Sequence, residues 1–246
     1  MKVTDCYWEQ KNLNKKVVEI NIEPNDAFDR EIINQSSKGY EYICVKVPVG
    51  KTDFNFGLSD MGYTMIECQY RISKSFKDFD FNDKFVKILL PNINVEEIKT
   101  EDEFEMILSN MSEGMFSTDR IVLDPHFNMS DGLLRYQNWM KTEFNNKSSQ
   151  FLVTYFKGMP IGFGMYRKDK FGYDALLGGI FESYQGIGLG LLTCCQAFIY
   201  GLQKQEQFVR MITSISSNNV PVVEIYNYFD YKIKETRYVY IKHTLK

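Results

Sequence analysis

The sequence predicts an α/β protein whose mixed central sheet is flanked by helices, and three patterns carry this prediction. Segments that alternate like strands are interleaved with segments of helical spacing. An apolar stripe with helical spacing, from Leu191 to Leu202, follows a glycine-rich loop. Two expected strands, Gln150–Phe156 and Pro160–Tyr166, are separated by a short glycine-containing turn that is typical of a β-hairpin.

The other elements follow from the same patterns in order along the chain. Apolar and polar residues alternate in the expected strands, whereas the expected helices repeat apolar residues every three or four positions. The first elements are strand Val17–Glu23, helix Asp26–Ser37, strand Tyr40–Val49, helix Thr52–Met61 and strand Tyr63–Lys74. Later elements are strand Val95–Lys99, helix Glu101–Met111, helix Asp131–Phe144 with Asp131 as N-cap, the hairpin, strand Tyr173–Phe181, the Leu191–Leu202 helix, strand Phe208–Ile215, helix Pro221–Tyr228 and strand Tyr231–Lys242.

The composition excludes several classes of function. The 246 residues are 44% hydrophobic, which is enough for a buried core, yet no stretch reaches the roughly 20 apolar residues of a membrane-spanning helix. The 29 basic and 32 acidic residues are dispersed, so no nucleic-acid partner is expected. The first residues contain no apolar signal core, which predicts a cytoplasmic protein.

The sulfur and imidazole side chains form no recognisable ligand pattern. The chain has five cysteines without a C-x-x-C pair, and two histidines, His126 and His243. The odd cysteine count and the spacing predict neither a disulfide framework nor a metal site.

A charged and aromatic segment, Lys77–Lys84, interrupts the periodic patterns and predicts two domains, residues 1–85 and 86–246. Residues Met61–Lys74 align without gaps on Phe229–Lys242, with identical residues at four positions. This similarity predicts that residues 1–85 are a truncated copy of the later part. Chance likeness between two segments with a turn and a long strand is the alternative.

The strongest local motif is the loop Tyr184–Gly190, which lies between an expected strand and an expected helix. Its glycines allow several backbone N–H groups to approach one anion, and the helix that follows adds the positive end of its dipole. The loop is therefore expected to bind a phosphate or pyrophosphate. A tight turn that packs the helix against the strand is the alternative.

Two common nucleotide-binding motifs do not fit this loop. A dinucleotide fingerprint needs G-x-G-x-x-G, whereas the third glycine here is one position early and too little chain follows Gly190 for a doubly wound sheet. A Walker loop needs Gly-Lys-Ser/Thr, which the sequence lacks.

Two motifs at this end of the chain resemble those of the GNAT superfamily of acetyl-CoA-dependent N-acetyltransferases. The pyrophosphate loop of that family, Gln/Arg-x-x-Gly-x-Gly/Ala, is matched by Gln185, Gly188 and Gly190. The second family motif is matched by Asn219, Val222, Ile225 and Tyr226. It ends in Asp230-Tyr231 where the family usually has Gly-Phe, and Asp tolerates the positive φ that this turn requires.

This resemblance implies the GNAT fold, with residues 1–85 as a truncated GNAT-like half, and acetyl-CoA as co-substrate. It implies that a backbone N–H near Ile180 faces the thioester carbonyl and that Asn219 anchors the cofactor arm. The residues expected to hold the pyrophosphate are Gln185, Gly186, Ile187, Gly188, Leu189 and Gly190. Tyr226 is expected to be the general acid, since a phenol of pKa about 10 is protonated at neutral pH and can protonate the departing thiolate. A tyrosine that only packs on the helix, as expected for Tyr228, is the alternative.

More narrowly, the chain resembles the TDP-fucosamine acetyltransferase group, which acetylates the amine of dTDP-4-amino-4,6-dideoxygalactose. The implied reaction is direct acetyl transfer to a nucleotide-linked amino sugar in a ternary complex. A GNAT enzyme for another primary amine and a catalytically silent CoA-binding module are the alternatives.

Three further questions stay open in the sequence. The candidates for a general base are Glu182, Asp174 and His126, and those for contact with a sugar nucleotide are Arg120, Tyr136 and Trp139. The aromatic closing strand, Tyr238–His243, is expected at an exposed sheet edge, where it would suit a homodimer.

Overall fold

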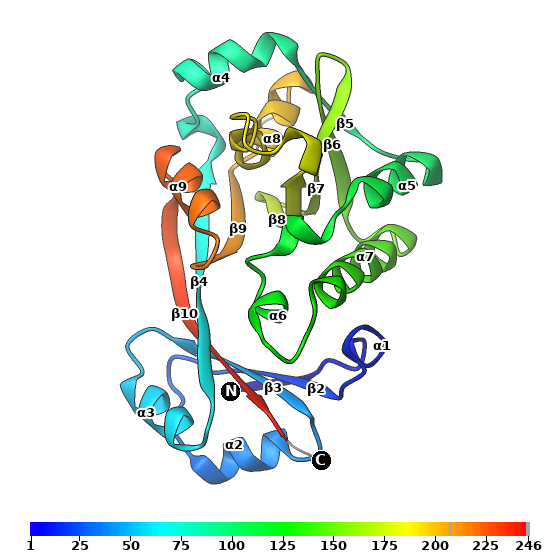
Figure 1. Cartoon of the computed structure of the whole chain (residues 1–246). Helices are drawn as coiled ribbons and strands as arrows, with labels where there is room; N and C mark the ends of the chain where they lie inside the picture. The colour runs from blue at the N-terminus through cyan, green and yellow to red at the C-terminus, as the bar shows by residue number, and fades with distance from the viewer. Residues whose placement is uncertain (207, 245–246) are drawn as a thin grey trace.

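A computed structural model describes residues 1–206 and 208–244, which form one mixed sheet of ten strands in the order β1-β2-β3-β10-β4-β9-β8-β7-β6-β5 (Figure 1). The strands are β1 (Lys2–Asp5), β2 (Val17–Asn21), β3 (Tyr42–Pro48), β4 (Thr64–Ser75), β5 (Ile93–Glu97), β6 (Gln150–Phe156), β7 (Met159–Asp169), β8 (Gly172–Ile180), β9 (Arg210–Ser216) and β10 (Lys232–His243). The α-helices are α1 (Glu9–Leu13), α2 (Arg30–Ser37), α3 (Thr52–Asp60), α4 (Lys84–Leu89), α5 (Glu101–Asn110), α6 (Arg120–Leu123), α7 (Met129–Asn145), α8 (Leu191–Gln203) and α9 (Val220–Tyr228). Short 3-10 turns complete the chain, among them η3 (Glu113–Phe116) and η4 (Glu182–Tyr184).

Helices cover both faces of the sheet in the part formed by β5–β9. Successive strand residues point to opposite faces, so Leu152 of β6 packs under α8 while its neighbours Phe151 and Val153 pack against α5 and α7. The predicted mixed α/β fold is therefore confirmed. The short elements β1, α1, α4 and α6 were not among the predicted ones, because each has too few residues to show a period.

Two helices of this part, α5 and α7, begin at side chains that satisfy their free N–H groups. Thr100 and Glu103 form a capping box at the start of α5. At α7 the predicted N-cap, Asp131, is wrong: the helix begins three residues earlier, at Asn128, and the Asp131 carboxylate accepts the Asn128 backbone N–H. Asp131 is thus the reciprocal member of a capping box, which puts an acidic side chain in the first turn just as an N-cap would.

The first part of the chain repeats the topology of the last part. In each, a strand is followed by a helix and a long strand, and β3, α3 and β4 recur as β9, α9 and β10 with bounds shifted by 168 residues. The turn before the long strand contains Gly62 (φ 79°) in one copy and Asp230 (φ 56°) in the other. The left-handed backbone of Asp230 explains why aspartate replaces the usual glycine there.

The two long strands are exchanged between the repeats. β10 lies between β3 and β4, and β4 in turn lies between β10 and β9. Figure 1 shows β4 and β10 running side by side from one half of the molecule into the other. Ile72 and Phe79, both before residue 85, also lie in the core around α8. The division at residue 85 stays a prediction, and the two parts share one sheet.

The expectation that the closing strand is a sheet edge is wrong. β10 has a hydrogen-bonded neighbour on each side, and Val239, Tyr240 and Ile241 are buried. Its aromatic character reflects packing in the core, so it does not indicate edge pairing in a homodimer.

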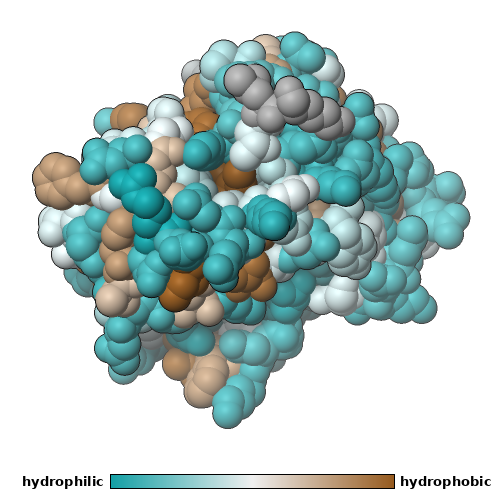
Figure 2. All heavy atoms as spheres, turned by 90° about the horizontal axis from the view of Figure 1, so that it is seen from below, coloured by the Kyte–Doolittle hydropathy of each residue, from teal (hydrophilic) through white to brown (hydrophobic). Residues whose placement is uncertain are grey.

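The surface below the β1–β3 part is mainly hydrophilic. Seen from below, hydrophobic side chains appear only as scattered patches (Figure 2). Within the described residues, no helix has the length and apolar content needed to cross a membrane.

Candidate functional site

The centre of the candidate site is the point where two parallel strands separate. β8 pairs with β9 only over Gly172–Ala175, and beyond this β9 follows β4 while β8 stays paired with β7. A bulge at Leu176 inserts one residue into β8 at this point, and a bulge bends the strand that carries it. Gly178 on one side of the opening and Ser214 on the other are exposed. The opening therefore leaves one edge of β8 free to meet an extended ligand.

The predicted phosphate loop lies directly beyond the open end of β8. Gly186 (φ 74°) and Gly188 (φ 84°) adopt the left-handed conformation that favours glycine. Residues 185–188 are exposed, and among the described residues the backbone N–H groups of Gly186–Gly190 donate no hydrogen bond. The thirteen-residue helix α8 begins immediately after them, with no acidic residue in its first turn. The loop thus offers free N–H groups at the positive end of a helix, an arrangement that is suited to an anion.

The predicted loop residues differ in their surroundings. The Gln185 side-chain amide donates to the Ile180 carbonyl at 3.1 Å, so it anchors the loop to the end of β8. Leu189 is buried in the core, and a Cβ on Gly190 would lie 3.7 Å from Ile225 of α9. Among the residues with unpaired N–H groups, Gly186, Ile187 and Gly188 are thus exposed, whereas Leu189 is buried and Gly190 is half-buried.

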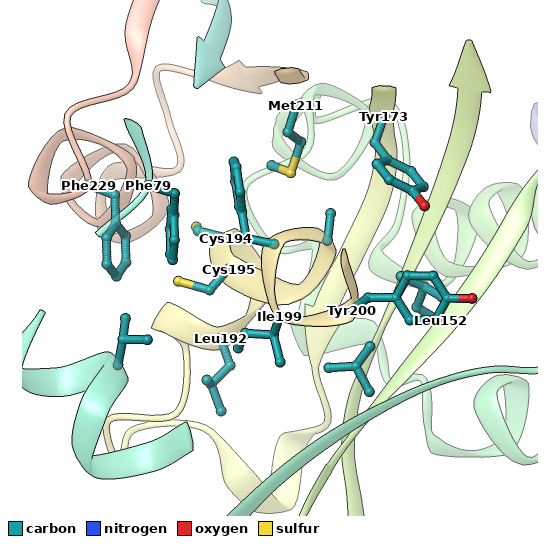
Figure 3. Packing of buried hydrophobic residues seen from close by; sticks show 14 of the residues in the cluster. Phe79, Leu152, Tyr173, Leu192, Cys194, Cys195, Ile199, Tyr200, Met211 and Phe229 are labelled. Atoms are coloured by element: carbon teal, nitrogen blue, oxygen red, sulfur yellow. The ribbon is translucent and has the colours of Figure 1, made fainter. Parts of the chain in front are cut away.

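The helix behind the loop is fixed by dense packing (Figure 3). The Phe79 ring stacks on Phe198 of α8 at 4.3 Å between centroids, and Phe79 also stacks on Phe229 at 5.6 Å. The buried Gln196 amide joins the helix to the sheet, because it donates to Thr154 at 2.7 Å and accepts from Tyr166 at 2.8 Å. An anion at the loop would therefore bind to a helix end that does not need to be ordered first.

Tyr226 lies on α9 against the first turn of α8. Its ring is 4.6 Å from that of Tyr231, and only 7% of the residue is exposed. Burial, together with the neighbouring Cys194 with which it is hydrogen-bonded, raises the pKa of Tyr226 well above its ordinary value. The phenol is thus a packed side chain that stays protonated beside the first turn of α8.

Asn219 is the residue at which α9 begins, just beyond β9 on the other side of the opening. Its side chain makes no capping hydrogen bond to the helix. The adjacent Asn218 has the structural role, since its amide donates to the Ile66 carbonyl of β4 at 3.0 Å. Ile180, the loop and Asn219 thus lie at the ends of β8 and β9, whereas Tyr226 is buried in the core between α9 and α8.

A polar cluster around Asp174, one of the predicted base candidates, lies on the sheet face opposite α8. The Arg71 guanidinium of β4 contacts the Asp174 carboxylate at 2.6 Å and the Ser214 hydroxyl at 3.1 Å. The second carboxylate oxygen of Asp174 is buried without a hydrogen-bond partner among the described residues. Arg71 could not be found from sequence because it belongs to the exchanged strand, which no local pattern assigns to this site.

The other candidates for acid–base or sugar contacts have different surroundings. Glu182 is exposed in η4 beside the loop. Tyr136 is hydrogen-bonded to Asp119 at 2.5 Å, and Trp139 donates to Glu143 at 3.2 Å within α7. His126 and Arg120 lie at the junction with the β1–β3 part, where Arg120 lines an interior cavity of about 140 Å³. A surface cavity of about 530 Å³ near Tyr40, Tyr63 and Lys242 contains none of the predicted site residues.

Comparison with protein-family models and with curated sequences finds no match. Solved structures do match. A GCN5-related N-acetyltransferase from Sphaerobacter thermophilus superposes with a TM-score of 0.55 at 10% identity, over 82% of this chain and 59% of that protein. A tandem GNAT protein from the clavulanic acid biosynthesis pathway superposes with a TM-score of 0.56 at 8% identity, over 92% of this chain and 75% of that protein. A glucosamine N-acetyltransferase region of a fungal multi-domain β-N-acetylglucosaminidase superposes with a TM-score of 0.59 at 14% identity, over 93% of this chain and 30% of that protein.

The chain has the GNAT fold. The match with a tandem GNAT protein agrees with the repeated topology of this chain, whose first part is the GNAT-like half that the sequence predicted. The chain spans less than two thirds of the Sphaerobacter protein and less than one third of the fungal protein. At these identities the likeness shows the fold.

Proposed function

We propose that the chain is an acetyl-CoA-dependent N-acetyltransferase. The observation that carries this proposal is the set of unpaired N–H groups in Gly186–Gly190 at the start of α8, beside the free edge of β8. Such a loop binds the pyrophosphate of CoA without basic side chains, and the free strand edge can hydrogen-bond the amide groups of an extended pantetheine arm. No metal ion is needed for this step.

The reaction assigned to the site is attack of an amine on the acetyl thioester in a ternary complex. Holding the amine and the thioester in contact lowers the barrier without a covalent enzyme intermediate. A backbone N–H at the end of β8, near Ile180, stabilises the oxyanion that develops on the thioester carbonyl. Asn219 contacts the cofactor arm from the β9 side, and Tyr226 donates its phenolic proton to the departing thiolate.

Asp174 is the candidate that the geometry favours as the proton acceptor for the amine. It lies where β8 and β9 begin to separate, and one of its oxygens is buried without a hydrogen-bond partner among the described residues. The ion pair with Arg71 fixes the orientation of the carboxylate. Glu182, by contrast, lies at the loop end of the opening, and His126 lies at the junction with the β1–β3 part.

We propose a nucleotide-linked amino sugar as the acceptor, because the sequence resembles that of the TDP-fucosamine acetyltransferase group. The fungal region with the same fold, which is named for glucosamine, supports testing amino sugars first. Arg120, Tyr136 and Trp139 add no support for this acceptor, because Tyr136 and Trp139 are hydrogen-bonded within the chain and Arg120 lines the cavity at the β1–β3 part.

A thiol-release assay with acetyl-CoA tests the proposal across a panel of acceptors. The panel contains dTDP- and UDP-linked amino sugars, free glucosamine, amino acids, polyamines and peptide N-termini. Release of CoA with a nucleotide amino sugar supports the full proposal. Activity only with polyamines or peptides contradicts the acceptor but retains the reaction, whereas acetyl-CoA binding without any turnover favours a silent CoA-binding module.

A further inference from the structure

Both histidines of the chain meet at one buried carboxylate, far from the opening between β8 and β9. Asp124 follows α6 and is 1% exposed. His126 Nδ1 lies 2.9 Å from one of its oxygens, and His243 Nε2, near the end of β10, lies 2.7 Å from the other. The two imidazole rings stack at 4.0 Å between centroids. The fold thus brings His243, 119 residues further along the chain, to the neighbouring pair Asp124 and His126.

The three groups are close enough to share one ion. Their ligand atoms all lie within 4.8 Å of one another. The His126 side chain is 58% exposed, so the group is open to solvent on one side. That side gives an ion an entry path and leaves room for a water ligand.

The surrounding side chains restrict the movement of the ligands. The Tyr42 ring lies 4.8 Å from the His243 ring, and the Phe127 ring lies 5.6 Å from it on another side. The His126 backbone N–H also donates to Asp124, at 3.0 Å, which fixes the carboxylate. Ligands that are already held in place need little ordering when an ion binds.

We propose that Asp124, His126 and His243 form a zinc site with one open coordination position. Two imidazole nitrogens and one carboxylate are a donor set that suits Zn²⁺ and Co²⁺ and is too soft for Mg²⁺ or Ca²⁺. Binding replaces the two hydrogen bonds between imidazole and carboxylate with metal bonds, and neutral imidazole supplies the lone pair at each nitrogen. The ion joins the end of β10 to the segment after α6, so it ties the β1–β3 part to the part that carries the candidate site.

The test uses the full chain and reads out the two histidines directly. Because the chain has only His126 and His243, imidazole ¹⁵N signals can be assigned with one variant. We expect one Zn²⁺ per chain to shift the signals of both rings and to raise the melting temperature, while Mg²⁺ at millimolar concentration does neither. Co²⁺ should give the absorption bands of a four-coordinate ion with nitrogen and oxygen ligands.

His126→Gln is the decisive variant, since it alters an exposed side chain. We expect it to weaken Zn²⁺ binding at least tenfold and to abolish the rise in melting temperature. Cys68→Ser, at the one cysteine that is not buried, is the matched control and should bind Zn²⁺ as the unchanged protein does. Unshifted histidine signals in the unchanged protein, or equal Zn²⁺ affinity in His126→Gln, would show a hydrogen-bonded cluster without a metal function.

Discussion

Gly188→Ala tests whether the loop conformation binds the cofactor. Gly188 has a φ of 84°, and a Cβ there would have no atom within 4 Å, so the substitution strains the backbone without a clash. Alanine in this conformation costs about 1–2 kcal/mol. The variant can relieve that cost by rotating φ, which turns the neighbouring N–H groups away from a bound phosphate. One misdirected hydrogen bond to a charged group costs about 1.5–3 kcal/mol, so acetyl-CoA should bind roughly 10- to 100-fold more weakly.

Gly158→Ala is the matched control for this prediction. Gly158, in the hairpin between β6 and β7, has a φ of 81° and also has no atom within 4 Å of a Cβ. Both variants should lose similar unfolding free energy in urea, while only Gly188→Ala should lose acetyl-CoA affinity in isothermal titration calorimetry. Equal acetyl-CoA affinities of the two variants would refute the assignment of the loop N–H groups to the pyrophosphate.

Three other substitutions or truncations test separate parts of the account. Tyr226→Phe should lower turnover at least tenfold in the thiol-release assay, while its affinity for acetyl-CoA in calorimetry stays near that of the unchanged protein. Unchanged turnover would show that Tyr226 is not the general acid. Burial raises the pKa of Glu19, but its neighbours Lys46 and Arg120 lower that pKa by more, from 4.5 to about 2 overall. The ionised Glu19 carboxylate therefore adds to the unfolding free energy above pH 4.5, and this contribution is lost as the pH falls towards 2. Glu19→Gln should therefore lower the unfolding free energy at pH 7 by about 2–3 kcal/mol and flatten its decline in acid, and an unchanged pH dependence would contradict this. A fragment of residues 86–246 should fail to fold alone, because it lacks β4, which lies between β9 and β10. Adding a fragment of residues 1–85 should restore its folding. A stable, folded 86–246 fragment in circular dichroism would show that the two parts are independent.

The sequence predicted the long elements well because each satisfies a local rule. The Leu191–Leu202 stripe has the period of a helix with one buried face, and α8 occupies that segment. The loop before it was found because its glycines permit backbone conformations that other residues avoid, and Gly186 and Gly188 do adopt them. The likeness between the segments ending in β4 and β10 appeared in the sequence, since both strands sit in equivalent surroundings.

The features that the sequence missed depend on contacts between distant residues. Nothing local shows that β10 is inserted between β3 and β4, so an aromatic central strand was interpreted as an exposed edge. The same exchange puts Arg71 beside Asp174. His126 and His243 showed no metal-ligand spacing, yet the fold brings both to Asp124. Spacing patterns detect ligands on one element, not ligands that only the tertiary fold assembles.

The most direct test of the central claim is a calorimetric titration of the full chain with acetyl-CoA and, in parallel, with S-acetylpantetheine, which lacks the pyrophosphate. The account predicts that acetyl-CoA binds with a Kd well below about 1 mM and that S-acetylpantetheine binds at least tenfold more weakly, since it cannot use the N–H groups of Gly186–Gly190. Absence of acetyl-CoA binding at about 1 mM, or equal affinity for the two ligands, would contradict it.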